Sequence, residues 1–200
     1  RDLGLSDSLL KSISAVGYEE PTPIQLATIP VLIDGADVIA QAQTGSGKTA
    51  AFGLPIIERI DPKLRRVQAI ILTPTRELAI QVSEALHKYG RHKEVETLPI
   101  YGGQPYERQF RGLQRGPQIV VGTPGRVMDH MRRGTLDLSD ISFFVLDEDL
   151  RFVATPLEPA LARVADRIGE NCEPALCTVL FLAGAGGSLR AGVTENPIAL

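Results

Sequence analysis

We predict an α/β fold with a mostly parallel central sheet and helices on both of its faces. Runs of apolar and β-branched residues alternate with helix-like runs between residues 37 and 146, which is typical of βαβ units. A Gly-Ser-Gly segment at residues 45–47 separates the first of these strands from the helix that follows it. In such a sheet, ligand-binding loops follow the carboxyl ends of the strands, so candidate functional residues are expected at that edge.

Two helices are expected before the first strand. Residues 6–16 carry apolar side chains at helical spacing and are followed by Gly17, a residue that commonly ends helices. Thr22 and Pro23 form an N-cap and first-turn pair for a second helix. Gln25 then lies in the first turn of that helix. It is either an ordinary surface residue or an amide that hydrogen-bonds to the edge of an adenine base.

Residues 42–49 have the pattern of a phosphate-binding loop between a strand at residues 37–40 and a helix. Gly45 and Gly47 allow positive φ angles, so consecutive N–H groups and the helix N-terminus can converge on a phosphate. The alternative is a flexible glycine-serine turn. Ala42 departs from the strict G-x-x-x-x-G-K-[ST] pattern, which has glycine at this position.

Four side chains are suited to chemistry on a nucleoside triphosphate. Lys48 would contact the β and γ phosphates, and the Thr49 hydroxyl would ligate Mg²⁺. After an apolar strand at residues 141–146, Asp147 would hold Mg²⁺ through its water shell and Glu148 would orient and deprotonate the attacking water. Two solvated carboxylates are the alternative for this acidic pair. We therefore expect hydrolysis of a nucleoside triphosphate.

The remaining elements alternate along the chain. Strands are expected at residues 67–72, 95–101, 119–121 and 141–146, and helices at residues 76–89, 104–114 and 124–132. Because the carboxyl ends of parallel strands share one edge, four segments should meet there. These segments are the phosphate loop, residues 73–76, residues 122–126 and residues 147–148.

Length and charge limit the function further. The 200 residues, 44% of them hydrophobic, fit one domain. A formal net charge of −3 argues against nucleic-acid binding through overall positive charge. Residues 104–133 form a locally basic region, which is either a binding patch or a set of solvated helix faces.

The same sequence bears on location. No apolar run is long enough to span a membrane, and the start lacks the form of a secretory signal. Cys172 and Cys177 lack further ligands for a zinc site and are expected to be reduced thiols. We expect a cytoplasmic protein. Because the chain begins at Arg1 rather than Met, we also expect a fragment of a longer protein.

Six segments, in this order, resemble the motifs of DEAD-box ATP-dependent RNA helicases. They are residues 17–25, 42–49, 74–79, 102–103, 123–126 and 145–148. The resemblance implies that residues 1–200 form the N-terminal RecA-like P-loop domain, with a Q-motif region at residues 1–36. It also implies ATP and Mg²⁺ as cofactors and RNA as partner, and the family accepts alanine at position 42.

The resemblance implies roles for individual residues. Tyr18 would pack near the adenine that Gln25 selects, and the remaining ATP contacts would come from Thr44, Gly45, Ser46, Gly47, Lys48 and Thr49. Thr49 and Asp147 would serve the metal, and Glu148 and Lys48 would be catalytic. The RNA backbone would be bound, without sequence preference, by Pro74, Thr75, Arg76, Gly102, Gly103, Thr123, Pro124, Gly125 and Arg126. A structural salt bridge is the alternative for Arg126.

The sequence departs from the family pattern after Glu148. The family has Asp-Glu-Ala-Asp where this chain has Asp-Glu-Asp-Leu at residues 147–150, so either alanine is replaced and the last aspartate lost, or one residue is deleted and Asp149 is that aspartate. Residues 178–181 resemble the strand before the family's Ser-Ala-Thr motif, but Leu-Ala-Gly stands in its place at residues 182–184. A natural variant, an altered chain and a reading-frame or sequencing error each account for these departures.

The second RecA-like domain of the family is absent from the sequence. In the family it supplies arginines that complete the ATP site, so we expect the isolated chain to bind adenine nucleotide weakly and not to unwind RNA. The alternative is a hydrolysis-deficient, nucleotide-responsive module that binds RNA or acts as a scaffold. A small-molecule P-loop kinase would explain neither Gln25 nor residues 123–126.

Overall fold

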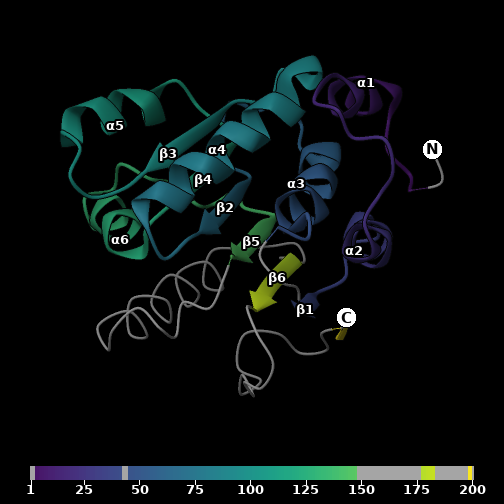
Figure 1. Cartoon of the computed structure of the whole chain (residues 1–200). Helices are drawn as coiled ribbons and strands as arrows, with labels where there is room; N and C mark the ends of the chain where they lie inside the picture. The colour runs from purple at the N-terminus through teal and green to yellow at the C-terminus, as the bar shows by residue number, and fades with distance from the viewer. Residues whose placement is uncertain (1–2, 42–44, 148–176, 183–197, 200) are drawn as a thin grey trace.

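The computed structural model describes residues 3–41, 45–147, 177–182 and 198–199 (Figure 1). Its strands are β1 (Val38–Gln41), β2 (Ala69–Leu72), β3 (Thr97–Ile100), β4 (Ile119–Gly122), β5 (Phe143–Leu146), β6 (Cys177–Leu182) and β7 (Ile198–Ala199). Its helices are α1 (Asp7–Ala15), α2 (Pro23–Ile33), α3 (Lys48–Arg59), α4 (Arg76–Gly90), the 3₁₀ turn η1 (Arg91–Lys93), α5 (Tyr106–Gln114) and α6 (Pro124–Arg132).

The described strands form one sheet in the order β3-β4-β2-β5-β6-β1-β7, and every pair in it is parallel. The register aligns the strand ends, because Leu72 of β2 pairs with both Gly122 of β4 and Leu146 of β5. The predicted parallel α/β fold is therefore confirmed, and the loops that follow these strands lie at one edge.

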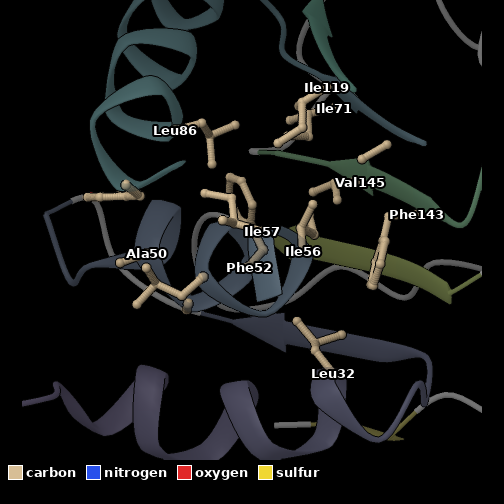
Figure 2. Close-up of a cluster of buried hydrophobic side chains, with 14 of the residues drawn as sticks. Leu32, Ala50, Phe52, Ile56, Ile57, Ile71, Leu86, Ile119, Phe143 and Val145 are labelled. Atoms are coloured by element: carbon tan, nitrogen blue, oxygen red, sulfur yellow. The ribbon is translucent and has the colours of Figure 1, made fainter. Parts of the chain in front are cut away.

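Side chains of the central strands alternate between two apolar clusters on opposite faces of the sheet. On one face, Ile71 packs with Phe52 and Ile57 of α3 and with residues of α2 and α4 (Figure 2). On the other face, Ile70 packs with Val127 and other residues of α6. Helices on both faces, as predicted, bury the sheet.

The predicted elements agree with the observed ones apart from small shifts at their ends. The helix expected at residues 104–114 begins at Tyr106, because Pro105 is its N-cap and Gln104 belongs to the preceding turn. The strand-like residues 178–181 lie within β6, which pairs with both β5 and β1. The short strand β7 was not predicted; two residues carry too little pattern to be recognised in a sequence.

The end of β4 requires glycine, which gives a prediction for stability. A Cβ built on Gly122 would lie 2.6 Å from Val127 Cγ2 and 2.7 Å from the Ile100 carbonyl oxygen. We expect Gly122→Ala to lower the unfolding free energy by about 1–3 kcal/mol through overpacking, measured as a lower Tm. Gly125→Ala is the control because a Cβ there meets no atom within 4 Å. Equal Tm values for both variants would contradict this account.

Candidate functional site at the carboxyl edge of the sheet

The phosphate-binding loop leads directly into α3. Gly45 and Gly47 have φ angles of 80° and 89°, the left-handed conformation that glycine permits. Gly47 is the N-cap of α3, and Lys48 and Thr49 begin its first turn. The first N–H groups of this helix, which have no intrahelical acceptor, therefore face the loop.

Two polar side chains of the loop fit a phosphate ligand. Ser46 Oγ is buried and has no hydrogen-bond partner among the described residues, so a phosphate oxygen would satisfy it. Lys48 is only 7% exposed, so its side chain is shielded from solvent. Thr44, a predicted ATP contact, and Ala42, where the loop departs from the strict pattern, lie outside the described residues.

Gln25 connects α2 to the phosphate loop. Its side chain is 2% exposed, and Oε1 accepts a hydrogen bond from the Thr22 N–H at 3.1 Å. Nε2 donates to the Gly47 carbonyl oxygen at 3.2 Å. Each end of the amide keeps a second hydrogen-bonding position, so an adenine contact is compatible with both bonds. The bond to Gly47 was not predicted, because sequence spacing does not show that residues 25 and 47 meet.

Tyr18 contacts α4. Its hydroxyl lies 3.0 Å from the Tyr89 hydroxyl, and the two rings pack edge to face with centroids 6.0 Å apart. Burial, with the hydrogen bond to Tyr18, raises the pKa of Tyr89 above its ordinary value. The segment before α2 is thereby fixed to the core, and the packing of Tyr18 near adenine stays a prediction.

Asp147 lies at the carboxyl end of β5, between the phosphate loop and the loop after β2. Its backbone N–H donates to the Leu72 carbonyl oxygen at 2.9 Å, which extends the β5–β2 ladder by one residue. Asp147 is 4% exposed, so its carboxylate is held at a defined place. Glu148, Asp149 and Leu150 lie outside the described residues.

The loops after β2 and β3 are neighbours. Thr75 is the N-cap of α4, and its Oγ1 accepts from the Leu78 N–H at 3.2 Å. Arg76 is exposed and forms a 2.7 Å ion pair with Glu77, an exposed pair that competes weakly with other ligands. A Cβ built on Gly103 would lie 3.5 Å from Arg76 Nη1. The structure therefore brings residues 74–76 and 102–103 together.

Arg126 is held by neutral partners rather than by an acid. Its Nη1 donates to the Gln104 carbonyl oxygen and to Gln109 Oε1, both at 3.1 Å. Thr123, the N-cap of α6, is half-buried, and Gly125 is exposed. Among the described contacts of Arg126 there is no salt bridge, so this alternative is wrong, and Arg126 ties α6 to the loop after β3.

Two buried polar residues beside Arg126 were not predicted. Gln109 of α5 is 1% exposed and His130 of α6 is 0% exposed, and His130 Nε2 lies 3.1 Å from Gln109 Oε1. Burial and the nearby positive charge of Arg126 lower the pKa of His130 to about 4. The sequence carried no signal for this pair, because glutamine is mostly exposed and histidine is intermediate in burial.

The predicted segments fall into two adjacent groups along the edge. The nucleotide segments follow β1 and β5, whereas the RNA segments follow β2, β4 and β3, and the sheet order keeps the groups apart. The groups meet where Asp147 adjoins the end of β2. Of the helices in the described part of the chain, none combines the length and apolarity needed to cross a membrane.

Several curated proteins are similar to this chain. A DEAD-box ATP-dependent RNA helicase CshA of Bacillus cereus is 58% identical over 148 residues, which are 74% of this chain and 28% of the relative. The ATP-dependent RNA helicase DeaD of Klebsiella pneumoniae is 57% identical over 148 residues, which are 74% of this chain and 23% of the relative. The chain thus spans less than a third of the length of these relatives.

Solved structures agree with the fold. A DEAD box protein from the hyperthermophile Methanococcus jannaschii superposes with a TM-score of 0.80 and 39% identity, over 92% of this chain and 49% of that one. An S. cerevisiae dbp5 variant bound to a gle1 variant and ip6 gives a TM-score of 0.88 and 34% identity, over 100% of this chain and 51% of that one. The DEAD/DEAH box helicase family model matches residues 22–185. The chain therefore belongs to the DEAD/DEAH box helicase family, of which it forms a RecA-like DEAD-box domain.

Proposed function

We propose that this chain is the ATP-binding, N-terminal RecA-like domain of an ATP-dependent RNA helicase, in which ATP hydrolysis drives the unwinding of RNA duplexes or the remodelling of RNA–protein complexes. The observation that carries the proposal is the arrangement of nucleotide segments and RNA segments side by side on one sheet edge. The helicase names of the similar curated proteins support it. The domain would comprise residues 1–200, with a Q-motif region at residues 1–36.

On the nucleotide side, Gln25 would select adenine with Tyr18 packed near the base. The phosphates would be held by residues 44–49, where the N-terminus of α3 and Lys48 offset their charge. Thr49 and Asp147 would hold Mg²⁺, which when bound neutralises phosphate charge. Glu148 would orient and deprotonate the attacking water, and with Lys48 it would form the catalytic pair.

On the RNA side, the helix N-termini at Thr75 and Thr123 would face backbone phosphates. Gly102, Gly103 and Gly125 would allow the RNA backbone to approach closely, and Pro74 and Pro124 would fix the turns that place these loops. Arg76 and Arg126 would pair with phosphates. Contacts of this kind carry no base information, so binding would be independent of sequence.

The activity of the whole protein would depend on a second RecA-like domain that supplies the rest of both sites. Residues 1–200 alone would bind adenine nucleotide weakly, hydrolyse little ATP and unwind no RNA. We place the protein in the cytoplasm. Robust RNA-stimulated ATP turnover by this chain alone would refute this part of the proposal.

A second candidate function follows from the residues after Glu148. Because Asp-Glu-Asp-Leu stands at residues 147–150 where the family has Asp-Glu-Ala-Asp, the chain would be a hydrolysis-deficient module that binds RNA or acts as a scaffold. The test restores Asp-Glu-Ala-Asp in a two-domain protein and compares its RNA-stimulated ATPase with that of the given sequence. Equal activity excludes the scaffold.

The adenine contact gives a prediction. We expect Gln25→Ala to reduce the preference for ATP over GTP by about 5- to 150-fold, because a bidentate amide–adenine contact contributes about 1–3 kcal/mol of discrimination. The variant also loses the bond to Gly47, so affinity for both nucleotides should fall. Titration of both nucleotides by calorimetry measures the ratio. An unchanged ratio would show that Gln25 does not read the base.

The RNA contact gives a second prediction, at Gly125. A Cβ at this position fits the free protein, but it would occupy the space that an RNA backbone needs. We expect Gly125→Ala to weaken single-stranded RNA binding by about tenfold, equivalent to about 1.4 kcal/mol, with unchanged Tm and nucleotide affinity. Fluorescence anisotropy at low salt measures it. Full RNA affinity in this variant would place the RNA elsewhere.

A further inference from the structure

Gln109 links three segments on the RNA side of the edge. Its Nε2 donates to the Tyr101 carbonyl oxygen at 2.8 Å and to Gln104 Oε1 at 3.3 Å. Its Oε1 lies 3.1 Å from both Arg126 Nη1 and His130 Nε2. The two N–H groups and two lone pairs of the amide are thus all used, which is uncommon for a single buried side chain.

The partners fix the direction of each hydrogen bond. A guanidinium only donates, so the oxygen of the Gln109 amide must face Arg126. His130 Nε2 must then carry the proton and donate to the same oxygen. Thr135 Oγ1 lies 2.9 Å from His130 Nδ1 and 3.1 Å from the His130 carbonyl oxygen, to which it can donate. The Tyr106 hydroxyl lies 2.6 Å from the same oxygen atom of Thr135.

The surroundings of His130 keep its ring neutral. Burial is the largest cause that lowers the pKa of His130, to about 4; the positive charges of Arg126 and Arg133 add to this effect, and the negative charge of Asp129 opposes it. The His130 ring stacks on the Tyr106 ring with centroids 4.3 Å apart. Arg133 Cζ lies 4.3 Å from the centroid of the Tyr106 ring. The Gln109 amide therefore has one orientation, with its oxygen towards Arg126 and His130 and its nitrogen towards Tyr101 and Gln104.

We propose that Gln109 is a positioning residue for RNA binding, which holds Arg126 and the loop at residues 102–104 in one arrangement, with His130 fixing the direction of its amide. This inference rests on the proposed RNA-binding function. Both described bonds of Arg126 use Nη1, so the Nε and Nη2 donors are left for a phosphate. Without Gln109, the guanidinium would lose one of its two supports and its orientation.

The test compares two buried glutamines. Gln109→Met removes the proposed positioning residue. Gln118→Met is the matched control, because Gln118 is 0% exposed and its amide bonds to Glu96, Pro62 and Leu64 at the opposite end of β4. We expect Gln109→Met to weaken binding of a single-stranded RNA decamer to the chain by about tenfold. Gln118→Met should lower Tm comparably and leave RNA affinity unchanged.

The outcomes separate the two proposals. If the unsubstituted chain binds no RNA at low salt, the proposed function fails and the positioning role with it. If the chain binds RNA and both variants bind it equally well, the positioning role alone is overturned. A loss of RNA affinity in Gln118→Met as large as that in Gln109→Met also overturns it, because the effect would then follow stability.

Gln109→Glu tests the same hydrogen bonds with a side chain of nearly the same shape, so the packing around residue 109 changes little. A carboxylate still accepts from Arg126 and His130 but cannot donate to Tyr101 or Gln104. We expect weaker RNA binding together with a His130 pKa raised from about 4, because a facing negative charge favours the imidazolium. An NMR titration of the His130 ring follows it. An unchanged pKa would show that the two side chains do not meet.

Discussion

The parallel pairing of the strands is the constraint on which the candidate site depends. Because β1, β2, β3, β4 and β5 all run in one direction, with Leu72 level with Gly122 and Leu146, every loop that follows them starts from the same edge. Segments distant in sequence thereby become neighbours, and the contacts between them follow from this alignment. The apolar clusters on the two faces hold this alignment, so burial of the sheet fixes the positions of polar loops that contribute little burial themselves.

The segments proposed to bind nucleotide and those proposed to bind RNA share a boundary at the end of β2. Asp147 donates its N–H to the Leu72 carbonyl oxygen at 2.9 Å. Thr73, the residue after Leu72, donates its N–H to the Gly122 carbonyl oxygen at 3.0 Å. A change in the backbone at Asp147 would therefore act on the turn that leads into α4. Thr73 is 0% exposed and its hydroxyl bonds to the Thr75 carbonyl oxygen at 3.1 Å, so this turn has little freedom to absorb such a change.

The sequence predicted the parts of the structure that local chemistry determines. Pro23 and Pro124 begin α2 and α6, and Gly47 caps α3 in the left-handed conformation, because these residues have restricted or special backbone angles. The partners of Gln25, Gln109 and His130 could not be predicted, since each bond joins segments whose meeting depends on the packed sheet. The sequence indicated Arg126 as a candidate phosphate partner, but it did not indicate that Arg126 donates to the Gln104 carbonyl oxygen and to Gln109 Oε1.

Gln25 and Gln109 use the same device on the two sides of the edge. Each is a buried glutamine whose amide accepts a hydrogen bond from one group and donates one to a loop carbonyl. Gln25 accepts from the Thr22 N–H and donates to the Gly47 carbonyl oxygen. Gln109 accepts from Arg126 and donates to the Tyr101 carbonyl oxygen. A carboxylate in either place would repel phosphate, and an ammonium would bind phosphate itself. At the proposed nucleotide and RNA sites, a neutral amide would hold a loop beside phosphates without doing either, and the positive charge would come from Lys48 and the arginines.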